Sequence, residues 1–224
     1  MPSAWVFGPF VIQDRLVYIV ASFVLALLFY RLVANPFPKD KVKQHIDQWF
    51  SLLFTFIVIL WVAKIIVHFD VFLADFRSIL AYPADVTSLY IAIVAVFLYT
   101  AIKHPLKSKE RMMQWYSWLY MLLATLFIYH FYQLIWEDAN ASISTVGVTV
   151  ALLVFVTLIE NRAIATVVMG VGWAASSFII SFFLSVPFFH FPVDKWFYAL
   201  VLICLFAILL LQRRRETSWN RRST

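Results

Sequence analysis

The 224-residue chain is 63% hydrophobic and only 13% charged, whereas a soluble domain has about 45–50% apolar and about 25% charged residues. A soluble fold of this size could not bury so much apolar surface, so the composition excludes a water-soluble globular protein and predicts an integral membrane protein. The formal net charge of +6 then indicates basic cytoplasmic loops that face anionic lipid, and we expect no nucleic-acid partner.

Several apolar segments exceed the roughly 18 residues that a membrane-spanning helix needs. Glycine is scarce and long alternating runs are absent, so the pattern favours helices over a β-barrel. The single cysteine, Cys204, excludes an intrachain disulfide and a thiolate metal cluster. The N-terminus has no basic segment before a short apolar core, so no cleavable signal peptide is expected.

The chain begins with residues 1–10, an aromatic segment with Pro2, Gly8 and Pro9 that reads as an interfacial lead-in. Seven apolar spans follow, and together they predict an all-α bundle in one transmembrane domain, residues 1–212. The predicted spans cover residues 16–34, 49–69, 88–102, 113–136, 143–159, 163–189 and 196–211.

Two further segments complete the predicted organisation. Between the second and third spans, residues 72–81 place apolar side chains on one side and polar ones around the rest, which predicts a short interfacial helix. Residues 213–224 form a basic cytoplasmic tail that we expect to be solvated and disordered.

The basic residues outside the spans test the number of spans. With seven spans, one side of the membrane receives Arg15, Arg77 and Lys195. The other side receives Lys39, Lys41, Lys43, Lys103, Lys107, Lys109, Arg111, Arg162 and the five arginines of the tail. The positive-inside rule therefore predicts an N-terminus outside and a C-terminus in the cytoplasm.

Lys64 is the polar residue that stands out inside a span, because a lysine at membrane depth is costly and by default indicates function. It could bind an anionic lipid headgroup. Alternatively, its stem could carry the ammonium to the outer interface, or an aspartate could pair with it.

Arg15, at the start of the first span, could hold a lipid phosphate in a bidentate contact, or it could serve as an interfacial anchor. Tyr18 and Arg77 complete the set of lipid-binding candidates.

His68 and His130 fall toward the outer halves of their spans, where they could act in acid–base chemistry. The alternative is interhelical hydrogen bonding, and Gln133 shares a helix face with His130. No HExxH motif and no pair of close intramembrane acids is present, so we expect neither a metal site nor a cofactor. The small-xxx-small spacings Gly147/Ala151 and Gly170/Ala174 indicate close helix packing.

Two stretches carry a resemblance to a known family: FGPFVIQDRLVYIVASFVLALLFYRL, residues 7–32, and AKIIVHFDVFLADFRSILAYPADV, residues 63–86. With seven predicted spans and the outer interfacial segment, this part of the chain resembles the bacterial prolipoprotein diacylglyceryl transferase family. The resemblance implies a multi-pass protein of the bacterial plasma membrane that meets membrane phospholipid, with Tyr18 at a family position.

The chain departs from that family in its catalytic motifs. Where the family has His-Gly-Gly, residues 87–90 read Thr-Ser-Leu-Tyr, and the Gly-Arg-x-Gly-Asn-Phe signature is absent. In the family this chemistry moves diacylglyceryl from phosphatidylglycerol onto a lipoprotein cysteine. The resemblance therefore implies a non-catalytic or divergent relative.

Three functions stay open. The first is a lipid-interacting or accessory role, in which an anionic phospholipid or a membrane or lipoprotein partner approaches Arg15, Lys64, His68 and Arg77. The second is an active phospholipid-dependent transferase of diverged mechanism, with His68 or His130 as base. The third is a small-solute or ion transporter in which Lys64 and Glu160 line a path.

Overall fold

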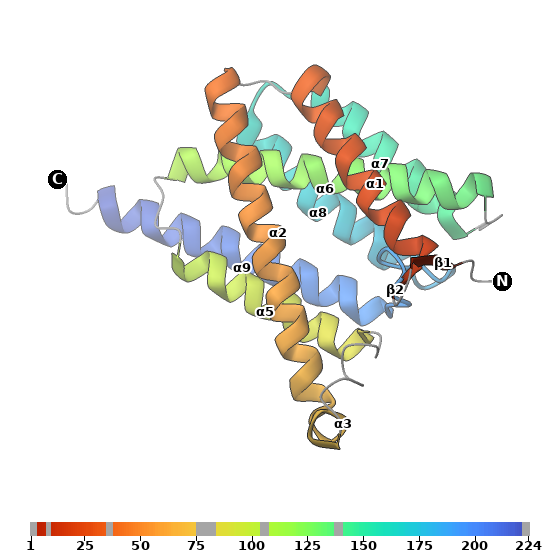
Figure 1. Ribbon diagram of the computed structural model, residues 1–224. Coiled ribbons are helices and arrows are strands. Elements are labelled where there is room, and N and C mark those ends of the chain that lie inside the picture. The colour runs from red at the N-terminus through yellow and green to blue at the C-terminus, as the bar shows by residue number, and fades with distance from the viewer. Residues whose placement is uncertain are drawn as a thin grey trace. The chain divides into compact units, whose positions relative to one another are not determined.

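The computed structural model describes the backbone of residues 4–7, 10–34, 38–74, 84–103, 108–136 and 141–220, and the side chains of residues 17–32, 38–73, 84–100, 110, 112–136 and 142–207. In these residues helices dominate, as predicted (Figure 1). The helices are α1 (Asp14–Phe29), the π-helical turn η1 (Tyr30–Ala34), α2 (Lys39–Val67), α3 (Phe69–Ala74), α5 (Val86–Lys103), α6 (Ser108–Trp136), α7 (Ala141–Thr157), α8 (Arg162–Ile180) and α9 (Lys195–Asn220).

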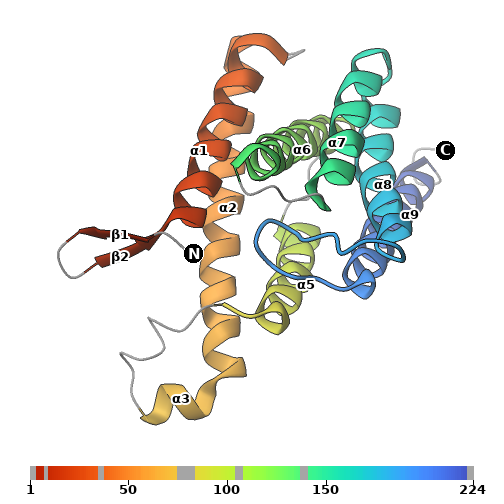
Figure 2. The same ribbon diagram turned by 90° about the vertical axis from the view of Figure 1, so that its right-hand side faces the viewer.

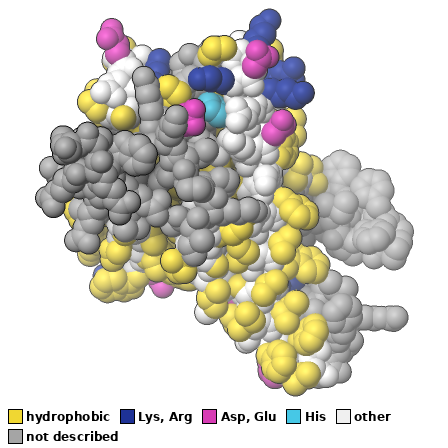
Figure 3. All heavy atoms as spheres, turned by 90° about the vertical axis from the view of Figure 1, so that its left-hand side faces the viewer, with side chains coloured by type: hydrophobic (Ala, Val, Ile, Leu, Met, Phe, Trp, Pro, Cys, Tyr) yellow, Lys and Arg dark blue, Asp and Glu magenta, His cyan; other side chains and the backbone are white. Residues whose placement is uncertain are grey.

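Three helical segments are long and apolar enough to cross a membrane: Lys39–Val67, Met112–Trp136 and Arg162–Ile180. Four shorter apolar helices accompany them: Val17–Leu32, Val86–Thr100, Ser142–Thr157 and Lys195–Ala207. On the face that Figure 3 shows, hydrophobic side chains make up much of the described surface. The prediction of a helical membrane protein is therefore confirmed, while seven spans and their orientation stay predictions.

The chain divides into two compact units. The first contains Met1–His45 and Lys109–Leu202, and the second contains Ile46–Ser108 and Ile203–Thr224. Helices α2 and α9 each contribute to both units, because α2 changes unit after His45 and α9 after Leu202. Each polar site described below lies within one unit.

Helices α7 and α8 lie side by side in the first unit (Figures 1 and 2). Gly170 and Ala174 are buried on α8, as their small-xxx-small spacing predicts. A Cβ atom at Gly172 would lie 3.0 Å from Leu152 Cδ2, so the two helices approach closely at this glycine. Gly147 is different, because it is exposed and no described atom would come within 4 Å of its Cβ.

The lead-in segment folds as an antiparallel hairpin, which the all-α prediction did not include (Figure 2). Strand β1 (Ala4–Phe7) pairs with β2 (Phe10–Gln13), and Ala4 lies opposite Gln13. Both strands are rich in aromatic and β-branched residues, which suit extended backbone. Helix α1 begins directly after β2.

The prediction of a sixth span over residues 163–189 is wrong at its C-terminal end, because α8 ends at Ile180. The apolar residues that follow form a folded connection. Phe188 and Phe191 exchange two backbone hydrogen bonds, and Phe189 between them has φ 52°. Pro187 has no N–H to donate to a helix. Aromatic packing on Trp173 of α8, with ring centroids 5.9 Å apart, holds Phe188 in place of a helical continuation.

Two other boundaries differ from prediction. The helix after the second span begins at Phe69 rather than residue 72, and the predicted segment beyond residue 74 lies outside the described residues. Helix α9 continues to Asn220, so the backbone of the tail is helical where we expected disorder.

Candidate functional site

The C-terminal end of α2 holds a buried cation. Lys64 lies in the last turn of this helix and is only 6% exposed. Its Nζ atom lies 5.5 Å from the centroid of the Trp61 ring, one turn earlier. Among the described residues, no carboxylate lies within ion-pair distance of this ammonium. An indole ring therefore offsets part of the cost of burying the charge, and none of the described acids neutralises it.

His68 follows one turn after Lys64, where α2 gives way to α3. The backbone continues nearly helically through this turn, because His68 N–H donates to Lys64 O at 3.0 Å and Phe72 N–H donates to His68 O at 3.0 Å. The i, i+4 spacing places the two side chains on one side of the segment. The His68 side chain is 20% exposed. A partly exposed imidazole therefore follows the buried ammonium by one helical turn, at the end of the helix.

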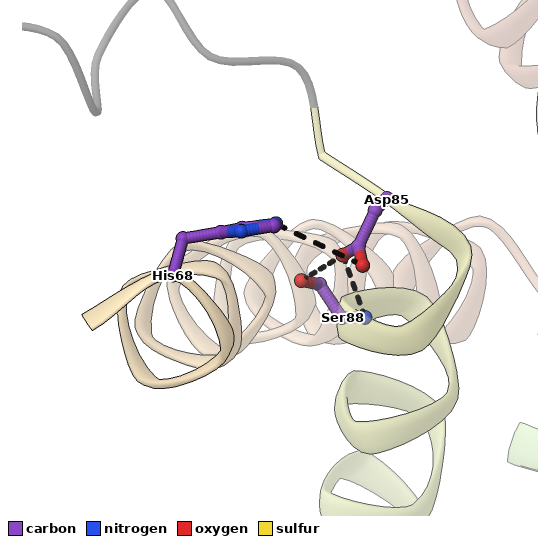
Figure 4. Close-up of polar contacts among 3 residues, drawn as sticks. All are labelled: His68, Asp85 and Ser88. Atoms are coloured by element: carbon purple, nitrogen blue, oxygen red, sulfur yellow. Dashed lines mark hydrogen bonds and ion pairs between the residues drawn. The ribbon is translucent and has the colours of Figure 1, made fainter. Parts of the chain in front are cut away.

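Asp85 caps the next helix and faces the same histidine (Figure 4). Its Oδ1 atom accepts hydrogen bonds from Ser88 N at 2.9 Å and from the Ser88 hydroxyl, which is the geometry of a helix N-cap on α5. Its Oδ2 atom lies 3.8 Å from His68 Nε2, an ion-pair distance rather than a hydrogen bond. The cap thus holds the carboxylate in a fixed position beside the imidazole.

The pKa of Asp85 lies below its ordinary value of 3.8. Partial burial alone would raise this pKa, but the Ser88 hydroxyl, the Ser88 amide and the charge of His68 favour the carboxylate and outweigh burial. Asp85 is therefore ionised at neutral pH. It orients His68 without lying within ion-pair distance of Lys64.

Lys64, His68, Asp85 and Ser88 together form what we call the α2-end site. Lys64 and His68 carry N–H groups that suit an anion, and Asp85 Oδ2 holds the histidine in place through its contact with Nε2. Within the described residues, no group of three or more His, Cys, Asp or Glu side chains could hold a metal ion. The chemistry that this site suits is recognition of an anionic oxygen group.

The remaining predicted site residues lie elsewhere. Tyr18 stacks on Tyr132 of α6, with ring centroids 3.8 Å apart, so its ring makes an interhelical contact in the first unit. His130 is fully buried on α6. Arg15 lies in the first turn of α1, but its side chain lies outside the described residues, as does all of Arg77. Glu160 is exposed between α7 and α8, in the first unit, whereas Lys64 belongs to the second.

A second polar network, which the sequence analysis missed, joins three buried residues of the first unit. The Tyr30 hydroxyl donates to Ser117 Oγ at 2.7 Å, and the same Oγ lies 2.9 Å from His45 Nδ1. The three residues are 0%, 0% and 7% exposed, respectively. The sequence did contain one indication that His45 is buried. Val42, His45 and Trp49 recur at the spacing of one helix face, and the structure buries all three. The network links η1, α2 and α6.

No protein-family model, no curated protein and no solved structure matches this chain.

Proposed function

We propose that the protein is a multi-pass protein of the bacterial plasma membrane that binds an anionic phospholipid headgroup at the α2-end site. One observation carries this proposal: Lys64 is 94% buried, with a Trp61 ring beside it and no carboxylate in reach among the described residues. Burying a charge without a partner costs several kcal/mol. A phosphate oxygen at Nζ would supply the missing negative charge.

The surroundings of Lys64 favour a lipid over a freely diffusing anion. Apolar side chains at the end of α2 and the start of α3 are exposed, among them Val62, Ile66 and Phe69, and acyl chains would cover such a surface. His68 follows Lys64 by one turn and is 20% exposed, so its imidazole would line the same headgroup site. Charge and apolar surface therefore meet at one helix end, as a phospholipid requires.

The proposed topology has seven spans, with the N-terminus outside and the C-terminus in the cytoplasm. The seven apolar helical segments of the described chain support the number, and the uneven distribution of Lys and Arg between the two sides supports the orientation. In this topology the α2-end site faces the outer leaflet.

The proposed role is accessory rather than catalytic, as in a non-catalytic or divergent relative of lipoprotein diacylglyceryl transferases, with a lipoprotein or another membrane protein as partner. The catalytic motifs of that family are missing from the chain. The site itself supplies groups that bind and orient, namely an ammonium, an imidazole and a capping carboxylate.

An active transferase of diverged mechanism is the second candidate, because Asp85 lies opposite the imidazole of His68, 3.8 Å away. A carboxylate in that position can orient an imidazole that takes a proton from a nucleophile. A phosphatidylglycerol turnover assay tests it directly. Turnover that His68→Ala and His130→Ala leave unchanged would count against this candidate.

Native mass spectrometry of the protein, extracted gently with its lipids, tests the lipid site. The variant Lys64→Met removes the charge and keeps the length of the side chain. Lys195→Met is the matched control, because Lys195 also lies over aromatic rings, 4.8 Å from Phe182, but is not buried. We expect the wild type and Lys195→Met to retain an anionic phospholipid that Lys64→Met loses.

The opposite results are equally clear. If no specific lipid is retained, or if all three proteins retain the same lipid equally, Lys64 is a structural residue and the proposal fails. The double variant Arg15→Ala/Lys64→Ala extends the experiment to the start of α1. A further loss of lipid in the double variant would assign Arg15 to the same headgroup.

A further inference from the structure

Helices α6 and α7 each carry a buried polar atom that has no hydrogen-bond partner among the described residues. These atoms are His130 Nε2, on a side chain that is 0% exposed, and Thr145 Oγ1, on a side chain that is 6% exposed. Leaving such atoms unpaired costs about 1–3 kcal/mol each. Natural interiors keep few such atoms, so each calls for an explanation.

The hydrogen bonds around His130 define what its free nitrogen offers. Ser142 Oγ donates to Gln133 Oε1 at 3.4 Å and also contacts His130 Nδ1 at 3.4 Å. A serine hydroxyl has only one hydrogen, so the contact with Nδ1 requires that Nδ1 carries the proton. In the neutral imidazole, Nε2 then carries no proton and can accept a hydrogen bond from a donor.

Thr145 lies on α7, one turn after the serine that contacts His130. It follows Ser142 by three residues, and this spacing puts the two side chains next to each other on α7. A threonine inside a helix usually donates to the carbonyl four residues earlier. Thr149, one turn later, does so at 2.7 Å, but Thr145 does not, so its hydroxyl stays available toward His130.

We propose that the interface between α6 and α7 binds a hydroxyl group that donates to His130 Nε2 and pairs with Thr145 Oγ1. The side chains there carry no charge when the histidine is neutral: Tyr129, His130, Gln133, Ser142 and Thr145. They suit a neutral ligand rather than an ion. A hydroxyl donates and accepts at once, so a single group satisfies both orphan atoms. Its source is either a water molecule or an alcohol of a lipid headgroup.

The proposal is independent of the α2-end site, since Lys64 takes no part in it. A hydroxyl held on a neutral imidazole nitrogen also has the geometry in which a base accepts a proton from an alcohol. The site therefore gives His130 a ligand-binding role that a purely structural hydrogen bond would not.

The variant Thr145→Val decides the proposal by the sign of its effect on the melting temperature. If nothing binds, the substitution removes an unpaired buried hydroxyl and adds an apolar methyl group, so the melting temperature rises. If a hydroxyl binds, the substitution breaks its contact, and we expect a fall of about 2–4 °C. Thr149→Val is the control, because that hydroxyl donates within its own helix. A rise in Thr145→Val would overturn the proposal.

A second measurement on the wild type does not depend on a variant that folds. Nitrogen-15 NMR of labelled histidines, with His130 assigned by His130→Gln, reports whether Nε2 accepts a hydrogen bond. We expect the hydrogen-bonded shift in nanodiscs of phosphatidylinositol. The same shift in phosphatidylcholine, whose headgroup has no hydroxyl, identifies water, and a shift confined to phosphatidylinositol identifies the headgroup alcohol. A free Nε2 in both lipids would refute the site.

Discussion

The hydrogen bond between Tyr30 and Ser117 gives a quantitative test of the packing in the first unit. Ser117 Oγ accepts from the Tyr30 hydroxyl at 2.7 Å, contacts His45 Nδ1 at 2.9 Å and can donate to Met113 O at 3.1 Å. The perturbation is a double-mutant cycle that combines Tyr30→Phe with Ser117→Ala. Each substitution removes a hydroxyl and leaves the carbon framework nearly intact.

The expected magnitudes follow from burial, since both side chains are 0% exposed. Ser117→Ala leaves the buried Tyr30 hydroxyl without its acceptor and takes one partner from His45, so we expect a loss of about 2–4 kcal/mol in the free energy of unfolding. Tyr30→Phe alone should cost about 1 kcal/mol. In the Ser117→Ala background it should cost nothing, because the orphan hydroxyl goes with it.

The coupling energy between the two substitutions is therefore about 1 kcal/mol. Interhelical hydrogen bonds in membranes give about 0.6 kcal/mol on average and at most about 1.7 kcal/mol, and this bond is short and fully buried. Equilibrium unfolding in mixed micelles measures the cycle. Thr125→Val is the control, because the Thr125 hydroxyl bonds only within α6, to Met121 O. Equal effects of Tyr30→Phe in both backgrounds would refute the reasoning.

Three further predictions concern helix packing, acid stability and topology. Gly147→Ala should raise the melting temperature, because alanine favours helix by about 1 kcal/mol and its Cβ meets no described atom. Gly172→Ala should raise it less, because the new Cβ must displace Leu152 Cδ2 from 3.0 Å. Equal gains for the two variants in thermal unfolding would contradict this packing. The pKa of Asp85 is lower in the folded protein than its ordinary 3.8, so its stabilising effect is present above that pH and is lost as the pH falls through the folded pKa. Asp85→Asn should keep the helix cap but remove the loss of stability at acid pH. Asp85→Ala should in addition lose about 1 kcal/mol of capping free energy at all pH values. If Asp85→Asn leaves the pH profile of stability unchanged, the charge of this carboxylate does not stabilise the fold. In a Cys204→Ser background, a single cysteine placed before α1 should react with an impermeant thiol reagent added from the outside. A single cysteine placed after α9 should react only when the reagent is added from the cytoplasmic side. Labelling of both cysteines from one side would contradict seven spans.

The sequence predicted the order of the helices correctly but misplaced the end of α8. Apolar runs and prolines predicted helices in the right order, because the average composition of a segment of about 20 residues determines whether it suits a membrane helix. The same criterion failed beyond Ile180. Phe182, Phe183 and Leu184 are as apolar as any span, and hydropathy does not distinguish a helix from an aromatic connection that packs on Trp173.

The α2-end site likewise has one part that the sequence predicted and one part that only the structure shows. Lys64 and His68 lie in one short segment, so their spacing alone placed them together, and an unusual residue type at membrane depth drew attention to them. Asp85 is 17 positions from His68 in the sequence, and only the fold brings the two side chains together. The sequence also could not show that Lys64 is buried with no carboxylate within ion-pair distance among the described residues, since pairing with an aspartate was one of the alternatives.

The sequence by itself determined that the chain is helical, that it belongs in a membrane and which segments form its helices, because these properties follow from local averages of hydrophobicity. Only the tertiary structure decided which polar atoms meet. Tyr30 and Ser117 are 87 positions apart, and His45 and Ser117 are 72 apart. A hydrogen bond forms only within a few tenths of an ångström of its ideal length, and that precision comes from the packing of distant helices.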